Sequence, residues 1–247
     1  TVRFANLAEF FALSAELDDH HEYSVAWIDC LAKGADTGRG VFIVGDHAQY
    51  GSLEVGQRKK LSVPLTPPVS LINKLSLSAF NNLYWRVHPS QRTRGRSAYE
   101  PFFYPLDRVL HWNRIYGRRG FQQYQCVVPQ ASAEPAMAEL LRAIADAGQG
   151  SFLAVLKRCG DLRSPGLLSF PMPGTSLALD FPQSEQLENV VFPRLDDIVR
   201  AAGGRLYPAK DAHMSGADFR QAYPAWERLE ALRDPSLMSR FWSRVIL

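Results

Sequence analysis

Two glutamines lie two residues apart in the segment "FQQYQCVVP" (121–129), which otherwise has the composition of a buried strand. Side chains alternate between the two faces of a strand, so Gln123 and Gln125 point to the same side, roughly 7 Å apart. Each amide offers donors and an acceptor, so the pair suits a ligand that carries several hydroxyl groups. The alternative is the solvated face of a half-exposed antiparallel strand.

A lysine stands inside a second apolar segment, "SFLAVLKRC" (151–159), where it shares one face of the expected strand with Val155. The ammonium of Lys157 either reaches the edge of the sheet or faces a cavity that contains an anion or hydroxyl groups. A third segment, "GRLYPAKDAH" (204–213), leads from a strand into Tyr207 and Lys210. Lys210 has a simpler role available, because it could pair with Asp211 or with a helix end.

Familiar catalytic and nucleotide-binding motifs are absent from the sequence. It contains no GxGxxG, no GxxxxGK[ST], no HExxH and no GxSxG. The 28 basic residues nearly balance the 25 acidic ones, so the net charge of +3 does not indicate a nucleic-acid partner. We expect neither a resident metal ion nor nucleic-acid binding.

Cysteine usage favours a reducing compartment, and hydropathy predicts no membrane-spanning segment. The three cysteines are far apart and without CxxC spacing, which indicates buried thiols rather than disulfides: Cys30, Cys126 and Cys159. No apolar stretch approaches the roughly 18 residues of a membrane span. We therefore expect a cytoplasmic location.

A run of alternating arginines lies in the polar segment 88–101, at positions 92, 94 and 96. Such a run usually forms a mobile, solvated loop. The alternatives are a phosphate-binding device and a peripheral contact with an anionic membrane surface.

The order of expected elements indicates an α+β fold. Residues 22–30 and 39–47 read as an antiparallel strand pair. From residue 119 onward the order is strand, helix, strand, strand, helix, strand, and Pro193 is expected to bend the last helix. The short connections predict an antiparallel β-sheet with helices packed on one face.

A series of motifs in fixed order resembles the FAD-linked oxidases of the vanillyl-alcohol oxidase superfamily. Within it the decaprenylphosphoryl-β-D-ribose 2-oxidases are nearest and the aldonolactone oxidases more distant. The motifs are "YPLD" (104–107), "WNRIYG" (112–117), "GFQQYQCVVP" (120–129), "LSFPMPG" (168–174), "LDFP" (179–182) and "GGRLYPAKD" (203–211).

The resemblance implies a division of the chain. Residues 1–203 are expected to form the substrate-binding domain, and residues 204–247 a C-terminal segment that completes an FAD-binding domain. That FAD-binding domain is missing, and the chain begins at Thr1. We therefore expect part of a longer, FAD-dependent enzyme that alone neither holds FAD tightly nor catalyses.

The resemblance also assigns roles to residues of this sequence. It implies catalytic lysines at 157 and 210, cofactor contacts from Tyr207, Lys210 and Gln125, and a substrate pocket formed by Tyr104, Asn113, Arg114, Gln123, Gln125, Val155 and Ser176. The segment Thr175–Ala178 departs from the Trp-Asn-x-Cys segment of the ribose oxidases. The pocket is therefore expected to be smaller and less polar there.

The expected function is the substrate-binding portion of an FAD-dependent oxidoreductase that oxidises a sugar hydroxyl to a ketone. The expected substrate is a sugar or a polyprenyl-phosphoryl sugar, and a short-chain reductase is an expected partner. Two alternatives stay open. One is an aldonolactone or alditol oxidase, and the other is a stand-alone sugar-binding module without redox activity.

Overall fold

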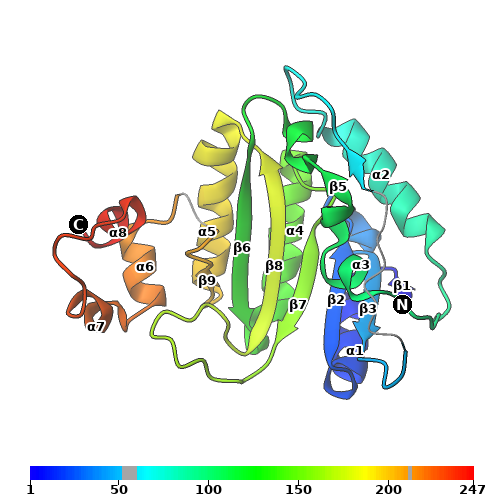
Figure 1. Cartoon of the computed structure of the whole chain (residues 1–247), viewed down its shortest axis with the longest axis horizontal. Coiled ribbons are helices and arrows are strands. Elements are labelled where there is room, and N and C mark those ends of the chain that lie inside the picture. Colours follow the sequence, from blue (N-terminus) through cyan, green and yellow to red (C-terminus); the bar gives the residue numbers. More distant parts are fainter. Residues whose placement is uncertain (52–59, 211–212) are drawn as a thin grey trace.

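A computed structural model of the 247-residue chain describes residues 1–51, 60–210 and 213–247. Within these residues the centre of the molecule is a seven-stranded sheet of order β1-β3-β2-β7-β8-β6-β9. All neighbouring strands of this sheet run antiparallel. The helices α4 and α5 lie behind it in Figure 1. The predicted α+β class, an antiparallel sheet flanked by helices, is confirmed.

The strands of the main sheet are β1 (Val2–Phe4), β2 (Tyr23–Ile28), β3 (Gly40–Gly45), β6 (Phe121–Pro129), β7 (Val155–Cys159), β8 (Gly174–Pro182) and β9 (Arg205–Leu206). A separate parallel pair joins β4 (Leu61–Ser62) and β5 (Val109–Leu110). The helices are α1 (Leu7–Leu17), α2 (Lys74–Val87), α3 (Tyr99–Phe103), α4 (Ala133–Ala147), α5 (Phe192–Ala201), α6 (Gly216–Ala222), α7 (Trp226–Glu230) and α8 (Arg240–Ile246).

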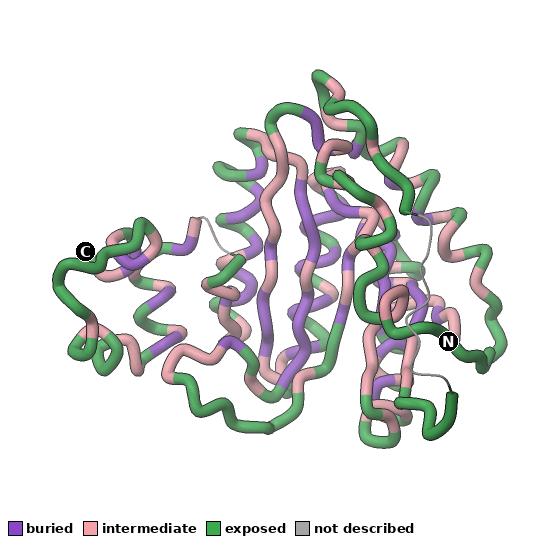
Figure 2. The backbone as a smooth tube through the Cα atoms, viewed as in Figure 1, coloured by how far each residue is buried: buried purple, intermediate pink, exposed green. Residues whose placement is uncertain are grey.

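The hydrophobic core lies between one face of the sheet and the helices. On β6, Tyr124, Cys126 and Val128 are buried against this helical layer, whereas Gln123 and Gln125 lie on the opposite face. Figure 2 shows the buried residues running along the central strands and the helices behind them. On the central strands β6 and β8, the face that carries Gln123 and Gln125 is the one turned away from α4 and α5, here called the open face.

Local signals in the sequence place the helix ends. The side-chain oxygen of Asn6 accepts a hydrogen bond from the backbone N–H of Glu9 (3.1 Å), which satisfies a donor that the first turn of α1 would leave unpaired. Gly148 ends α4 with a φ of 65°, a left-handed conformation that glycine adopts at little cost. A π-helical turn, Leu187–Val191, lies directly before α5, and Pro193 stands in the first turn of α5.

One strand prediction was too long. The strand expected over 151–159 begins only at Val155, because the hydroxyl of Ser151 instead bonds the backbone of Leu153 in a tight turn. The strand expected to lead into Tyr207 is present as the two-residue β9, and residues 208–210 form a turn after it.

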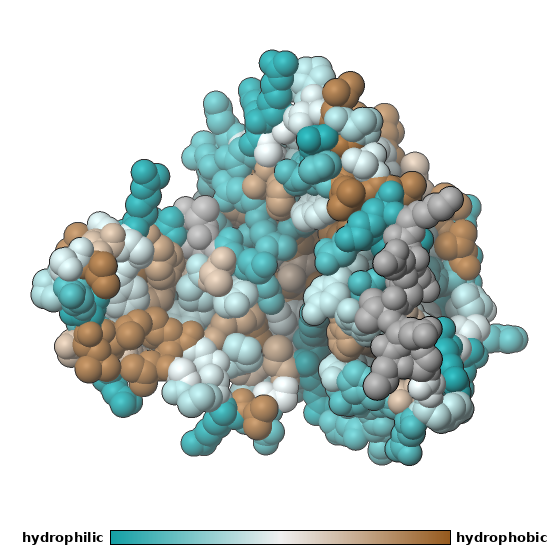
Figure 3. All heavy atoms as spheres, viewed as in Figure 1, coloured by the Kyte–Doolittle hydropathy of each residue, from teal (hydrophilic) through white to brown (hydrophobic). Residues whose placement is uncertain are grey.

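The helices α6, α7 and α8 form a group beside the sheet, at the left of Figure 1. Phe219 and Trp242 are buried in this group, with ring centroids 5.6 Å apart. A hydrogen bond from the Tyr223 hydroxyl to the Leu206 carbonyl (2.6 Å) joins the group to β9. Leu232, Leu237 and Met238 remain exposed, and apolar surface is visible on this group in Figure 3.

Candidate functional site

The register of the central strands brings residues of three segments together on the open face. Gln125 of β6 lies opposite Ala178 of β8, which lies opposite Val155 of β7. Lys157 of β7 lies opposite Ser176 of β8. Opposed residues of an antiparallel pair project to the same side, so the predicted amide, hydroxyl and ammonium groups share one surface. In Figure 3 this surface is set back between the C-terminal helices and the opposite side of the molecule.

Both glutamines on the open face are anchored by neighbours on β8. The Gln125 amide nitrogen donates to the Ser176 hydroxyl (3.4 Å). Gln123 lies opposite Asp180, and its side-chain amide favours the ionised form of that carboxyl group. Gln122 points to the other face, where its amide binds groups near the surface. Gln123 and Gln125 are half-buried and held in place, unlike side chains of a fully solvated strand face.

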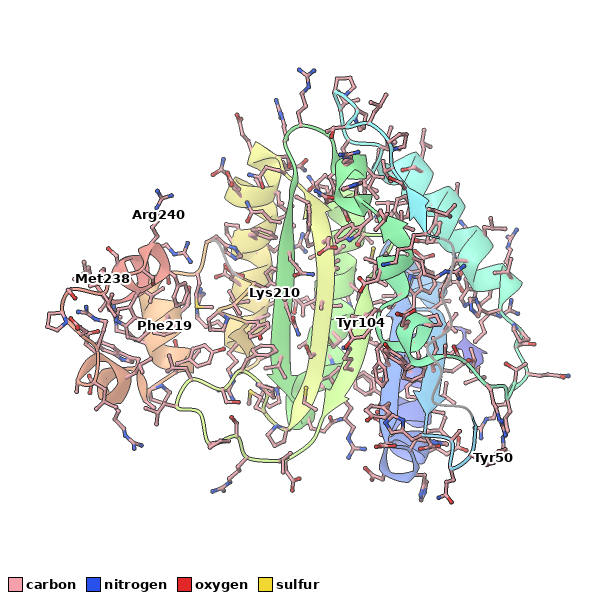
Figure 4. The ribbon with its side chains drawn as sticks, in the orientation of Figure 1. Tyr50, Tyr104, Lys210, Phe219, Met238 and Arg240 are labelled. Carbon is pink, nitrogen blue, oxygen red and sulfur yellow. The ribbon has the colours of Figure 1, made fainter. Side chains whose placement is uncertain are left out.

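The chain after β9 stays beside β6 for one more residue and then turns. The backbone N–H of Tyr207 donates to the Gln125 carbonyl (2.9 Å), and that of Lys210 donates to the Tyr207 carbonyl (3.1 Å). The Tyr207 ring stacks on Phe170 with centroids 4.5 Å apart. These contacts place exposed Lys210 over the sheet, as Figure 4 shows. The alternative partner Asp211 lies outside the described residues.

Asp180 is a functional candidate that the sequence analysis missed. It lies on the open face yet is only 3% exposed, and its Oδ1 is buried without a hydrogen-bond partner among the described residues. Burial raises the pKa of this carboxyl to about 6, while the Gln123 hydrogen bond and the Lys210 charge lower it. The available signal was a lone carboxylate within the otherwise apolar "LALDFP".

Three predicted pocket residues come from segments outside the main sheet. The Arg114 guanidinium donates to the backbone carbonyls of Val63 (2.9 Å) and Pro64 (2.8 Å), so it holds a loop in place. Asn113 is exposed on the same 3₁₀ segment, Trp112–Tyr116. Tyr104 follows α3 and is 53% exposed; Figure 4 places it across the face from Lys210. Their roles in binding stay predictions.

A groove of about 1120 Å³ runs along the open face from Val155 and Lys157 to α3. Its lining includes Tyr23 and Trp27 of β2 and Phe103 of α3. The Tyr23 and Phe103 rings meet edge-on with centroids 4.8 Å apart. The groove is therefore largely aromatic and aliphatic along this wall, and it begins beside the polar groups of the central strands.

The arginine run is partly occupied by contacts within the chain. Arg92 donates to the carboxylate of Glu16 (2.7 Å), and the Arg96 guanidinium lies 4.0 Å from the centroid of the Tyr50 ring. Contact with an anionic membrane surface stays a prediction. Among the helices of the described residues, none combines the length and the hydropathy that crossing a bilayer requires.

Comparison with known proteins agrees with the motif order. The chain is 33% identical to the decaprenylphosphoryl-β-D-ribose oxidase of Mycolicibacterium smegmatis over 87% of its own length. It is 31% identical over 96% of its length to a Streptomyces coelicolor protein described as an uncharacterized protein in the mprA 5′ region. The chain belongs to the decaprenylphosphoryl-ribose oxidase family. It spans 49% of the first relative and 68% of the second. No family model matches it.

Membership of the decaprenylphosphoryl-ribose oxidase family implies FAD, and the open face has groups of a suitable kind. Flavin presents carbonyl oxygens and ring nitrogens at one edge, and Lys210 and Lys157 offer ammonium donors on this face. Tyr207 adds an aromatic ring that is already stacked on Phe170. Gln125, Tyr207 and Lys210, the cofactor residues expected from the sequence, therefore fit the group in chemical type.

Proposed function

We propose that this chain supplies the substrate-binding part of an FAD-dependent oxidoreductase that oxidises a sugar hydroxyl to a ketone. The observation that supports this most is the meeting of Gln125, Ser176 and Lys157, from three separate strands, on one open and hollowed face. Amide, hydroxyl and ammonium groups in one place suit a ligand with several hydroxyl groups and an anionic centre.

The side chains of the site have separate tasks in this proposal. Gln123 and Gln125 orient neighbouring hydroxyl groups of the sugar. Lys157 and Lys210 stabilise negative charge that develops during the reaction, because ammonium groups on a partly dry surface act strongly on nearby charge. FAD, when bound, supplies the acceptor for the hydride that leaves the carbinol carbon.

The proposed division of the chain assigns residues 1–203 to substrate binding and residues 204–247 to an FAD-binding domain that the remainder of a longer protein would supply. The exposed Leu232, Leu237 and Met238 support this, because a further domain could bury them. The ketone product would then be passed to a short-chain reductase, the expected partner.

The groove beside the central strands supports a lipid-linked substrate. Its aromatic wall, Tyr23, Trp27 and Phe103, suits an isoprenoid chain, and Lys157 lies where the groove meets the polar part of the face. A polyprenyl-phosphoryl pentose could place its phosphate near this lysine and its sugar near the glutamines. The Mycolicibacterium smegmatis relative is named for a substrate of this class.

Flavin reduction in the full reading frame tests the proposal. The purified protein should absorb at about 450 nm, as oxidised flavin does. In the absence of oxygen this absorbance should fall when a prenyl-phosphoryl pentose is added. Gln125→Ala should lower kcat/KM by about tenfold, the value of one hydrogen bond to substrate. Gln122→Ala, on the other face of β6, is the matched control and should leave the rate unchanged.

The same experiment separates the alternatives. Equal bleaching by a free alditol or aldonolactone, without a lipid carrier, would replace the proposal with an aldonolactone or alditol oxidase. A colourless protein that binds sugars would replace it with a stand-alone binding module.

A further inference from the structure

The carboxyl group of Asp180 lies on the open face but is shielded from solvent. It lies opposite Gln123 in the β6–β8 ladder and is almost fully buried, although it is on the face turned away from α4 and α5. The charge of Lys210 acts on it from the turn after β9, and it acts in turn on the Tyr116 phenol of the 3₁₀ segment. Its Oδ1 has no hydrogen-bond donor in the part of the chain that the structure describes.

The neighbouring amide is constrained by this carboxyl group. An ionised carboxylate only accepts hydrogen bonds, so Gln123 must turn its NH₂ group toward Asp180. The carbonyl oxygen is then the end of the Gln123 amide that remains for a ligand. Gln125 is oriented in the same sense, since its amide nitrogen donates to the Ser176 hydroxyl. Both glutamines therefore keep their carbonyl oxygens for a ligand.

We propose that Asp180 is a positioning residue that fixes the polarity of Gln123, so that the site accepts hydrogen bonds from ligand hydroxyl groups. The ligand class is then a compound with neighbouring hydroxyls, favoured over the corresponding ketone. A ketone oxygen cannot donate, and opposite a carbonyl acceptor it loses a hydrogen bond that the alcohol makes. This choice of ligand class rests on the proposed function. A site that binds the ketone more weakly than the alcohol would favour release of an oxidised product.

Protonation of Asp180 should reverse the arrangement. A carboxylic acid donates through its O–H group, so the Gln123 carbonyl would turn inward and its NH₂ group outward. Gln123 from β6, Lys210 from the turn after β9 and Tyr116 from the 3₁₀ segment are the polar groups that act on this carboxyl. Burial raises the pKa of Asp180 to about 6, so the reversal falls in an accessible pH range.

The side-chain amide signals of Gln123 in a ¹⁵N-labelled sample of this chain test the inference. Their assignment follows from their loss in Gln123→Ala. We expect them to shift with pH around a midpoint near 6 in the wild type and to stay constant over that range in Asp180→Asn. The Gln122 amide, on the other face of the same strand, is the internal control. Gln123 signals that do not titrate, or that titrate equally in Asp180→Asn, would refute the role of Asp180.

Two further measurements keep the test decisive. If Asp180→Asn does not fold, the carboxyl carbon of Asp180 is followed in the wild type, and its midpoint must coincide with that of the Gln123 amide. Titration with ribitol and D-ribulose at pH 8 tests the ligand class, and ribitol should bind about fivefold more tightly, as expected for one hydrogen bond. Equal affinities, a preference for the ketose, or no binding of either compound would refute that class.

The amide titration requires neither flavin nor turnover. It can therefore fail while flavin reduction in the full reading frame succeeds, and the reverse outcome is equally distinct. Failure of the titration refutes the role of Asp180, whereas failure of flavin reduction refutes the proposed function.

Discussion

Replacing Asp180 by asparagine should stabilise the protein at neutral and alkaline pH. The substitution keeps the shape of the side chain and an oxygen for the Gln123 amide, but it removes a negative charge from a site that is 3% exposed. In the wild type that charge must be buried whenever the carboxyl group is ionised, and one of its oxygens has no donor among the described residues. Ionisation therefore costs folding free energy.

The magnitude follows from the pKa of Asp180, which burial raises from an ordinary value of 3.8 to about 6 in the folded protein. Each tenfold change in the protonation equilibrium corresponds to about 1.4 kcal/mol, so the difference amounts to about 3 kcal/mol. Because the folded-state pKa is the higher one, this stability is complete below about pH 4. It is lost as the pH rises through about 6.

Urea unfolding of the wild type and Asp180→Asn between pH 4 and pH 8 measures this effect. The variant should equal the wild type near pH 4 and exceed it by up to about 3 kcal/mol at pH 8. Asp107→Asn, at an exposed carboxylate, serves as the control and should change stability by less than about 0.5 kcal/mol. A variant that is less stable than the wild type at pH 8 would refute the reasoning, since the carboxylate would then be stabilising.

Three further outcomes are expected. Tyr223→Phe removes the donor to the buried Leu206 carbonyl and should cost about 1–2 kcal/mol in urea unfolding, so an unchanged midpoint would show that water replaces the hydroxyl. Asn6→Ala removes the cap of α1 and should cost about 1 kcal/mol, a value that Asn6→Asp should largely restore. A thiol reagent should label half-buried Cys159 in the native protein before the two fully buried thiols, whose pKa burial raises to about 12; equal labelling rates would contradict this.

Several features of this protein could be predicted from the sequence because they depend on short stretches of chain. The alternation along 121–129 separates Gln123 and Gln125 from the core whatever the rest of the chain does, because it follows from strand geometry. The caps at Asn6 and Gly148 depend on hydrogen bonds and dihedral angles within a few residues. The order of elements after residue 119 was likewise sufficient for the antiparallel α+β class.

Two other features depend on hydrogen bonds that the hydropathy pattern does not reveal. The apolar segment before Val155 could have continued the strand, but the Ser151 hydroxyl bonds the backbone and closes a turn. Arg114, whose role in binding stays a prediction, donates to the carbonyls of Val63 and Pro64, which lie about 50 residues before it in the sequence. Neither partner of Arg114 can be identified from local spacing.

The sequence by itself determined which residue types are available on the open face and to which family the motifs belong. Only the tertiary structure decided that Asp180 is buried between the sheet and the turn that carries Lys210. The pKa of a carboxyl group depends on how much solvent surrounds it and which charges lie near it. Those conditions are set by Lys210, 30 residues away in the sequence, and by Gln123, 57 residues away. They exist only once β8, β6 and the chain after β9 have come together.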